Sequence, residues 1–306
     1  MAYDGIVTKH IVSELKNVLI GGKINKIYEP NKNEILLGIY SHSINYCLNL
    51  SISSDSYRAN LTTHAKSNPL NALGFCMLLR KHLIGGKITN IYTIGLERII
   101  YIDFECYNEL NDLVKKQLIV ELMGKHSNII LTNSNGIIID SLRHLSTEEN
   151  STRDILPARP YNIPKNNKID FLSIKTFDEF YKILSNSQTL DVGISSKFIG
   201  ISKLFVQNII TQNNIDNTIN SPNLKIIYKY LCEILSKIET NEVSIIPFKN
   251  DFTINISNTE NNLQSNFFID DFYTEKENNL LFTTYRNNVL KLVLSTLSKI
   301  KKKLYN

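Results

Sequence analysis

The stretch LIGGKINKIY at residues 19–28 recurs almost unchanged as LIGGKITNIY at residues 83–92. Apolar residues at helical spacing precede both copies, and alternating apolar residues follow both. The glycine pair can end a helix in the left-handed conformation, so that a strand starts at the Lys-Ile dipeptide. The repeat predicts two units, each a helix followed by strands. The alternative is a chance recurrence of GGKI at two helix ends.

Alternating apolar residues continue through both halves of this region and predict antiparallel strands. The sequence NSNG at residues 133–136 is typical of a hairpin turn. We therefore expect an α+β fold with two packed antiparallel sheets and helices at their edges. The predicted strands are residues 34–40, 46–52 and 58–63 in the first half, and 98–104, 117–122, 127–132 and 136–142 in the second.

A proline- and asparagine-rich stretch, LPARPYNIP at residues 156–164, ends the first predicted domain, which covers residues 1–168. Residues 169–245 have a helical pattern and form the second predicted domain. Within it, FIGIS at residues 198–202 resembles the turn of a helix-hairpin-helix motif, formed by Gly200, Ile201 and Ser202. The amide groups of such a turn can hold a phosphate. An ordinary turn between helices is the alternative.

The last part of the chain is expected to return as strands over residues 246–274 and to become a helix over residues 275–306. Leucines at heptad spacing in this helix predict the start of a coiled coil, with a plain amphipathic helix as the alternative. The chain would then be the N-terminal part of a longer protein. These leucines are Leu290, Leu294, Leu297 and Leu304.

The composition excludes several classes of protein. The chain has 306 residues, 42% of them hydrophobic, and a net charge of +5, so any basic surface must be local. It shows no signal peptide, no run of about 18 apolar residues for a membrane helix and no paired cysteines, so we expect a cytoplasmic protein. The histidines lack metal-site spacing, and GKHS at residues 124–127 lacks the upstream glycine of a phosphate loop. We expect no metal, cofactor or catalytic residue.

Cationic side chains recur at the predicted ends of helices and strands. Arginine can grip two phosphate oxygens at once, and such positions are typical of contacts with a nucleic-acid backbone. A solvated charged rim is the alternative for any one of them. The candidates for RNA-phosphate contacts are Arg80, Lys81, Lys125, His126, Arg143, Arg153 and Arg159.

Six motifs together resemble the NFACT family, and within it the bacterial RqcH branch, whose older label is fibronectin-binding protein A. The resemblance covers the whole chain and implies a two-sheet domain, a helix-hairpin-helix domain and the root of a coiled coil. The motifs are MAYDG at residues 1–5, FCMLLRKHL at 75–83 leading into the second glycine pair, the pair Glu97-Arg98, ELMGKHSN at 121–128, RHL at 143–145, and Arg153 with LPARPY at 156–161.

The resemblance implies a factor of ribosome-associated quality control. Such a factor binds a large ribosomal subunit obstructed by peptidyl-tRNA, recruits alanyl-tRNA and supports template-free alanine tailing, while the ribosome itself forms the peptide bonds. The family's tRNA-binding residues fall on Asp4, Glu97 and Arg98, with Glu97 in place of the usual aspartate. Arg98 would donate to a phosphate or a base edge, and the two carboxylates would orient it or accept from bases or ribose. An ion pair within the domain is the alternative.

Two other functions remain as alternatives. The older label implies a surface adhesin that binds fibronectin or fibrinogen. The family also resembles formamidopyrimidine-type DNA glycosylases in fold, which leaves a nucleic-acid binder without lesion chemistry as the third hypothesis. The nucleophilic proline and adjacent glutamate of those enzymes are replaced by Ala2 and Tyr3, and the cluster of four cysteines for zinc is missing from the sequence.

Overall fold

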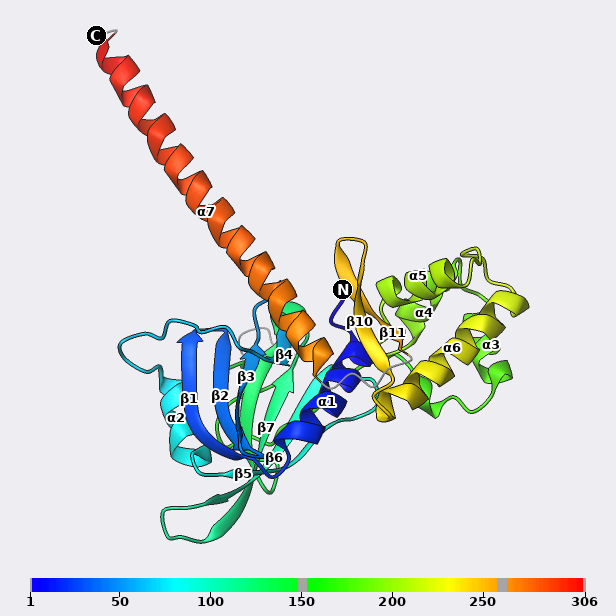
Figure 1. Cartoon of the computed structure of the whole chain (residues 1–306), viewed down its shortest axis with the longest axis horizontal. Helices are drawn as coiled ribbons and strands as arrows, with labels where there is room; N and C mark the ends of the chain where they lie inside the picture. The colour runs from blue at the N-terminus through cyan, green and yellow to red at the C-terminus, as the bar shows by residue number, and fades with distance from the viewer. Residues whose placement is uncertain (1, 148–152, 258–262, 305–306) are drawn as a thin grey trace.

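The computed structural model describes residues 2–147, 153–257 and 263–304. Its main feature is a nine-stranded antiparallel sheet with the order β4-β3-β2-β1-β5-β6-β7-β8-β9 (Figure 1). The strands are β1 (Lys23–Asn31), β2 (Glu34–Ser41), β3 (Ile44–Ser51), β4 (Arg58–Leu61), β5 (Lys87–Thr93), β6 (Ile99–Tyr107), β7 (Leu113–Glu121), β8 (Asn128–Asn133) and β9 (Ile138–Ser141).

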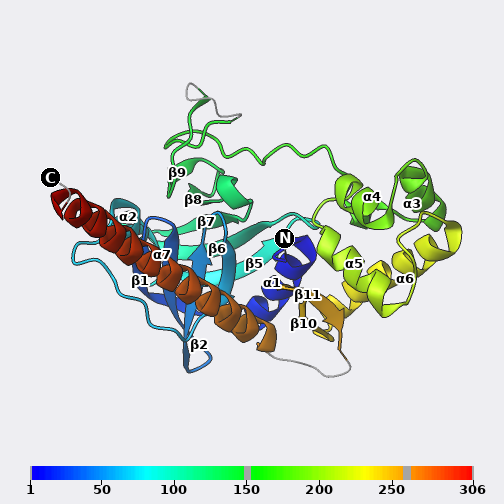
Figure 2. The same cartoon turned by 90° about the horizontal axis from the view of Figure 1, so that it is seen from above.

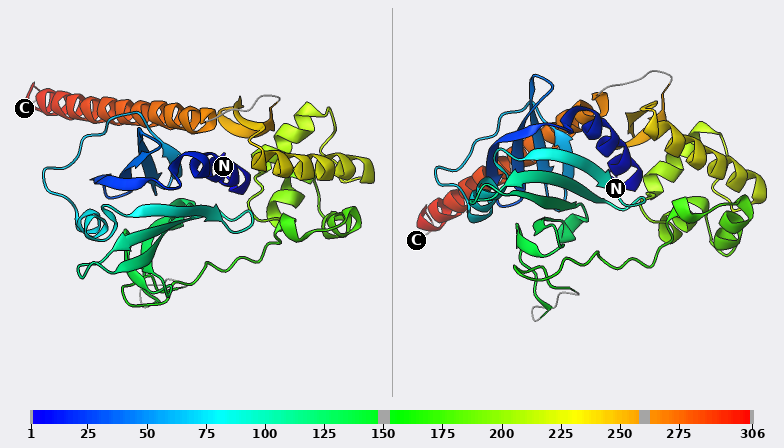
Figure 3. Two further views of the ribbon diagram at one scale, coloured as in Figure 1. Left: turned by 60° about the horizontal axis from the view of Figure 1, so that its bottom comes forward. Right: turned by 90° about the horizontal axis from the view of Figure 1, so that it is seen from below.

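The predicted α+β class is confirmed, but the two expected sheets are two halves of one continuous sheet. The halves join where β1 pairs with β5, and their one register pair there is Lys23 with Lys87. Figure 3 shows them as two layers. Apolar residues from both, among them Ile39 and Ile102, belong to the same buried cluster, so the halves pack face to face around a shared core.

The two copies of the repeated decapeptide bond to each other reciprocally. The amide of Gly21 donates to the carbonyl of Ile88, and the amide of Gly85 donates to the carbonyl of Ile24, both at 2.8 Å. Gly21 and Gly85 have φ angles of +85° and +77°, which glycine adopts without a Cβ penalty. A register shift follows Ile24 in β1 and Ile88 in β5. The recurrence is therefore structural and not a chance match.

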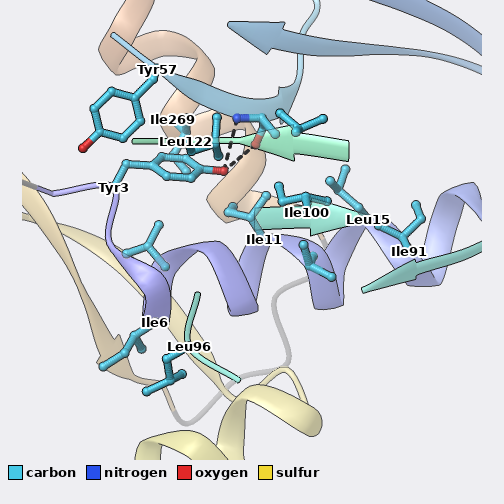
Figure 4. Packing of buried hydrophobic residues seen from close by; sticks show 14 of the residues in the cluster. Tyr3, Ile6, Ile11, Leu15, Tyr57, Ile91, Leu96, Ile100, Leu122 and Ile269 are labelled. Atoms are coloured by element: carbon cyan, nitrogen blue, oxygen red, sulfur yellow. Dashed lines mark hydrogen bonds between the residues drawn. The ribbon is translucent and has the colours of Figure 1, made fainter. Parts of the chain in front are cut away.

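Helix α1 (Gly5–Leu19) packs mainly against β5 and also contacts β4, the edge strand of the sheet. Its apolar side packs on the sheet (Figure 4), while its polar residues His10 and Glu14 are also buried. These two bind the start of the C-terminal helix: His10 Nε2 lies 2.7 Å from Ser265 Oγ. Helix α2 (Gly74–Leu83) buries fewer residues and packs beside β1.

A helical lobe follows the sheet and is connected to it by an extended linker (Figure 2). Its turn between α4 and α5 contains the predicted hairpin residues. The 168/169 and 245/246 domain boundaries stay predictions. The elements of the lobe are a short 3₁₀ turn η3 (Phe171–Ser173), α3 (Phe177–Leu184), α4 (Leu190–Lys197), α5 (Lys203–Gln212) and α6 (Ser221–Glu239).

A two-stranded sheet of β10 (Val243–Phe248) and β11 (Asp251–Ile256) precedes helix α7 (Gln264–Leu304). Residues 267–272, expected as strand, belong to α7. Phe268 and Phe272 are four residues apart, and their ring centroids lie 6.0 and 5.0 Å from that of Phe252. Helical spacing thus places both rings against β11, which an aromatic-rich segment does not reveal by composition.

Helix α7 leaves the body after its first turns and projects beyond it (Figure 1). The predicted heptad leucines are exposed, from 49% for Leu297 to 78% for Leu304, and the coiled coil stays a prediction. Across the described ranges, every helix is too short or too polar to cross a bilayer.

Candidate nucleic-acid interface

Three segments far apart in sequence meet at one point: the start of α1, the β5–β6 loop and the α4–α5 turn. The amide of Gly5 donates to the carbonyl of Gly200 at 2.8 Å. A Cβ atom on either glycine would lie 1.9 Å from the carbonyl oxygen of Leu96. The contact therefore requires glycine at both positions, and Gly200 also has a φ of +68°.

Asp4 ties two of these segments together. Its Oδ1 accepts from the amide of Val7 at 3.0 Å and so caps α1, while its Oδ2 accepts from the amide of Ser202 at 3.2 Å. The side chain is buried, and burial raises its pKa while the bonds from Ser202 oppose the rise. The predicted tRNA residue Asp4 thus directs its carboxylate to partners within the protein.

Arg98 lies beside this junction, just before β6. Its Nη1 donates to the hydroxyl of Tyr57 at 3.2 Å, and its guanidinium carbon lies 5.9 Å from the centroid of that ring. Tyr57 in turn packs edge-on against Tyr3, with centroids 6.5 Å apart. The aromatic pair holds the half-buried Arg98 side chain at the junction.

Glu97 and Arg98 both line a small pocket of about 120 Å³, together with Lys165 and Lys168 from the linker. The side-chain amide Nδ2 of Asn166 donates to Glu97 Oε1 at 3.4 Å. Burial raises the pKa of Glu97, and the Asn166 bond and the charge of Arg98 oppose the rise. The predicted pair thus shares one concave site with two exposed lysines.

A second pocket of about 920 Å³ adjoins the first, since Pro164 and Lys165 line both. Arg153 and Arg159 also line it. Arg159 is exposed, whereas Arg153 forms an ion pair with the buried Glu121 and donates to the carbonyl of Asn162 at 2.8 Å. Cationic side chains therefore follow the linker from the Arg98 pocket toward β9.

Arg143 is used inside the protein. Its Nη1 donates to the carbonyls of Lys125 and Ser127, each at 3.3 Å, and its Nη2 donates to Asn33 Oδ1 at 2.7 Å and to the carbonyl of Ile52 at 3.2 Å. The guanidinium joins the β7–β8 connection to loops of the first half-sheet. Its predicted phosphate contact competes with these bonds.

The remaining candidates lie outside the two pockets along the linker. Arg80 Nε donates to the carbonyl of Ile27 at 2.8 Å, and the exposed Lys81 pairs with Glu109 at 2.9 Å. Lys125 and His126 are exposed on the 3₁₀ turn η1 (Gly124–His126).

Three residues of the site were missed by sequence reasoning. Lys165 and Lys168 follow the proline-rich boundary directly, so the KNNK sequence at 165–168 could have indicated them. Tyr57 has no local signal, since its role depends on the distant Arg98 and Tyr3. Within residues 2–147, 153–257 and 263–304, no group of three or more His, Cys, Asp or Glu side chains is placed to hold a metal ion.

The family model described as NFACT N-terminal and middle domains matches residues 4–306. The chain belongs to the NFACT family. Among curated members, the Rqc2 homolog RqcH of Bacillus subtilis is 37% identical over 224 residues, which cover 72% of this chain and 39% of that protein. The Rqc2 homolog RqcH of Streptococcus suis is 30% identical over 307 residues, which cover 99% of this chain and 54% of that protein.

The NFACT fold also appears in solved structures. The structure of a fibrinogen binding protein from Staphylococcus aureus is 30% identical, has a TM-score of 0.74, and aligns over 89% of this chain and 99% of that one. The chain thus spans between two fifths and about half of the two curated NFACT relatives, and nearly all of the solved structure.

Proposed function

We propose that this chain acts in ribosome-associated quality control as an RNA-binding unit. It binds large ribosomal subunits obstructed by peptidyl-tRNA and recruits alanyl-tRNA for template-free alanine tailing in the cytoplasm. Support comes from NFACT relatives named Rqc2 homolog RqcH. The observation that carries the proposal is the meeting of Glu97 and Arg98 with two linker lysines in one pocket.

Each residue of the pocket has a separate part in this proposal. Arg98, oriented by Tyr57, donates to a tRNA phosphate or base edge, and Lys165 and Lys168 neutralise neighbouring phosphates. Glu97 cannot attract a phosphate and instead accepts from a base amino group or a ribose hydroxyl. Asp4 positions the helical lobe so that these groups face one ligand.

We also propose that the chain is not an enzyme and needs no cofactor. In this proposal the ribosome forms each peptide bond, and the chain contributes binding energy and orientation only. Tyr3 supports the same view against a glycosylase, because it is 1% exposed and its hydroxyl donates to the carbonyl of Ala59 at 2.7 Å (Figure 4).

The test is the substitution Arg98→Ala, compared with Arg286→Ala, which removes the same charge from an exposed position on α7. Binding of alanyl-tRNA at fixed salt should weaken about tenfold or more for Arg98→Ala, as expected for loss of a charge-assisted contact, and stay at the wild-type level for Arg286→Ala. In cells, alanine tails on stalled peptides should disappear with Arg98→Ala. Wild-type tRNA affinity in the folded Arg98→Ala protein would contradict the proposal.

A second candidate is an adhesin that binds fibrinogen or fibronectin, because the similar solved structure from Staphylococcus aureus is that of a fibrinogen binding protein. Saturable fibronectin or fibrinogen binding by intact cells, insensitive to salt and lost on deletion of the gene, would favour it. Retention of that binding in Arg98→Ala would separate the adhesin surface from the tRNA site.

A further inference from the structure

A pocket of about 490 Å³ lies between the end of α2 and the loop end of the β6–β7 hairpin, away from the Arg98 site. Lys81 and His82 line it from α2, Tyr107 from the end of β6, and Lys115 and Lys116 from β7. Basic residues from two elements therefore line a hollow that the proposed tRNA site does not use.

The floor of this pocket is a buried ammonium group. Lys116 is 9% exposed, and its Nζ donates to His82 Nδ1 at 2.8 Å and to the carbonyl of His82 at 3.2 Å. An ammonium group can only donate, so Nδ1 is unprotonated and the imidazole is a neutral ring with its proton on Nε2. Burial, followed by the charges of Lys116 and Lys81, lowers the pKa of His82.

The positive charge of the pocket is not balanced by its own lining. Among the described lining residues, three are lysines and one is a carboxylate, Glu109, which pairs with the exposed Lys81. Lys115 lies opposite Glu105 in the β6–β7 register. Burial, and to a smaller extent the charge of Lys81, lowers the pKa of Lys116. An anion in this pocket would relieve both the repulsion and the desolvation of Lys116.

An exposed aromatic ring lies beside these cations. Tyr107 is 69% exposed at the end of β6, and the neighbouring hairpin residue Leu110 is 81% exposed. A basic hollow next to an accessible aromatic face is the combination that holds unpaired nucleotides, because the cations take the phosphate and the ring stacks on a base.

The repeat shows that strand pairing does not require these cations. Strand pairing places Lys115 and Lys116 of the second copy at the positions of Asn45 and Tyr46 in the first. The first copy closes its hairpin with a two-residue turn, whereas the second extends over residues 108–112. The same strand pairing thus forms with uncharged residues at both positions, so the pairing itself does not require the two lysines.

We propose that this pocket is a second RNA site, in which Lys115 holds a phosphate of an unpaired segment and Tyr107, on the same face of the β6–β7 hairpin, stacks on the adjoining base. Lys81 and Lys116, on the side that faces α2, attract the next phosphate. This second site rests on the proposed function, since it assumes an RNA-binding protein. The pocket is separate from Arg98, so one RNA molecule or RNA-containing complex would contact the sheet domain at two places.

The test measures binding of a fluorescein-labelled single-stranded RNA decamer between 50 and 200 mM KCl. The variants are Lys115→Gln and Tyr107→Ala, both at exposed positions. Lys115→Gln should weaken binding and reduce the slope of log K against log salt by about 0.7, the value for one lost phosphate contact on a single strand. Tyr107→Ala should weaken binding about 5- to 150-fold, as for loss of one stacked base.

The matched control is Lys23→Gln, which removes an exposed lysine from a pocket in the first half of the sheet and should leave the affinity unchanged. Arg98→Ala should also keep decamer binding, so failure of the tRNA site and failure of this pocket give different results. Unlabelled tRNA and large ribosomal subunits as competitors identify the source of the RNA. Wild-type decamer affinity in Lys115→Gln and Tyr107→Ala, or equal competition by a poly-glutamate peptide, would overturn the proposal.

Discussion

The Oδ2 atom of Asp4 accepts a hydrogen bond from the amide of Ser202 at 3.2 Å, across 198 residues of chain. Its other oxygen caps α1, while Ser202 caps α5 through the bond from the Phe205 amide to its Oγ. Two helix starts are thus joined through one carboxylate. This junction sets how the helical lobe meets the sheet next to Arg98.

Removing this carboxylate should destabilise the fold. Asp4→Ala leaves the amides of Val7 and Ser202 without their acceptor, and loss of a helix N-cap alone costs about 1–2 kcal/mol. Asp4→Asn keeps one accepting oxygen, so its free energy of unfolding should fall by less than that of Asp4→Ala. The free energy of unfolding in urea measures both, with Thr176→Ala, the exposed cap of α3, as a comparison. Equal stability of wild type and Asp4→Ala would contradict the joining role.

The close approach at Gly200 makes a second prediction. Gly200→Ala meets both a left-handed φ and a Cβ position 1.9 Å from the Leu96 carbonyl oxygen. Gly136→Ala is the matched control, because Gly136 has a φ of +73° but nothing within 4 Å of its Cβ position. The free energy of unfolding of the control should fall by about 1 kcal/mol because of backbone strain. That of Gly200→Ala should fall clearly further. An equal decrease in the free energy of unfolding for the two variants, measured in urea, would mean that the contact between Gly200 and Leu96 does not stabilise the fold.

The repeat was enough to predict the α+β class and most strands, because the 2.0- and 3.6-residue periods are local properties. Periodicity could not show that α1 is buried on both sides. His10 and Glu14 look like a solvent-exposed face, and their partners Ser265 and Asn266 lie about 250 residues later.

The candidate site, like the fold, could be predicted from the sequence only in part. The resemblance supplied Asp4 and the Glu97-Arg98 pair, and the glycine turn supplied Gly200, each from its own short motif. No local sequence pattern could predict that these residues lie close together, because their proximity depends on the close approach of three distant backbone segments. Tyr57, which orients Arg98, was for the same reason outside the reach of sequence reasoning.

The attachment of α7 should depend on pH through Glu277. Burial alone would raise the pKa of Glu277, but the hydrogen bond and charge of Arg58 outweigh it and lower the pKa. A lowered native pKa stabilises the fold above the unfolded value of about 4.3, and this stability is lost as the pH falls through the native pKa. Glu277→Gln should therefore cost about 2 kcal/mol at pH 7, with the difference from wild type shrinking below pH 4.

Urea unfolding at pH 7, 5 and 3 measures this difference. Glu275→Gln, an exposed carboxylate on the same helix, should match the wild type at every pH. A gap between wild type and Glu277→Gln that stays constant from pH 7 to 3 would show that the ion pair with the fully buried Arg58 does not hold the helix root.

Arg143 should act on stability and not on RNA affinity. Arg143→Lys keeps the charge but replaces the planar fork that reaches four acceptors with a single ammonium group, so unfolding should become easier by about 1–3 kcal/mol. Arg159→Lys, at an exposed position, should be neutral. Thermal unfolding and decamer binding of the folded proteins separate the two roles. Unchanged stability with weaker RNA binding would instead assign Arg143 to the RNA contact.

The reciprocal bonds of the glycine pairs at residues 21–22 and 85–86 to Ile88 and Ile24 have the form of an isologous interface, in which the same patch meets itself across a two-fold axis. Here that axis lies within one chain, so the sheet domain is a covalently tied pseudodimer. In a true homodimer every substitution occurs twice. When the two copies are in one chain, a substitution can occur in one copy alone. The first copy can therefore have uncharged residues at positions where the second copy has lysines.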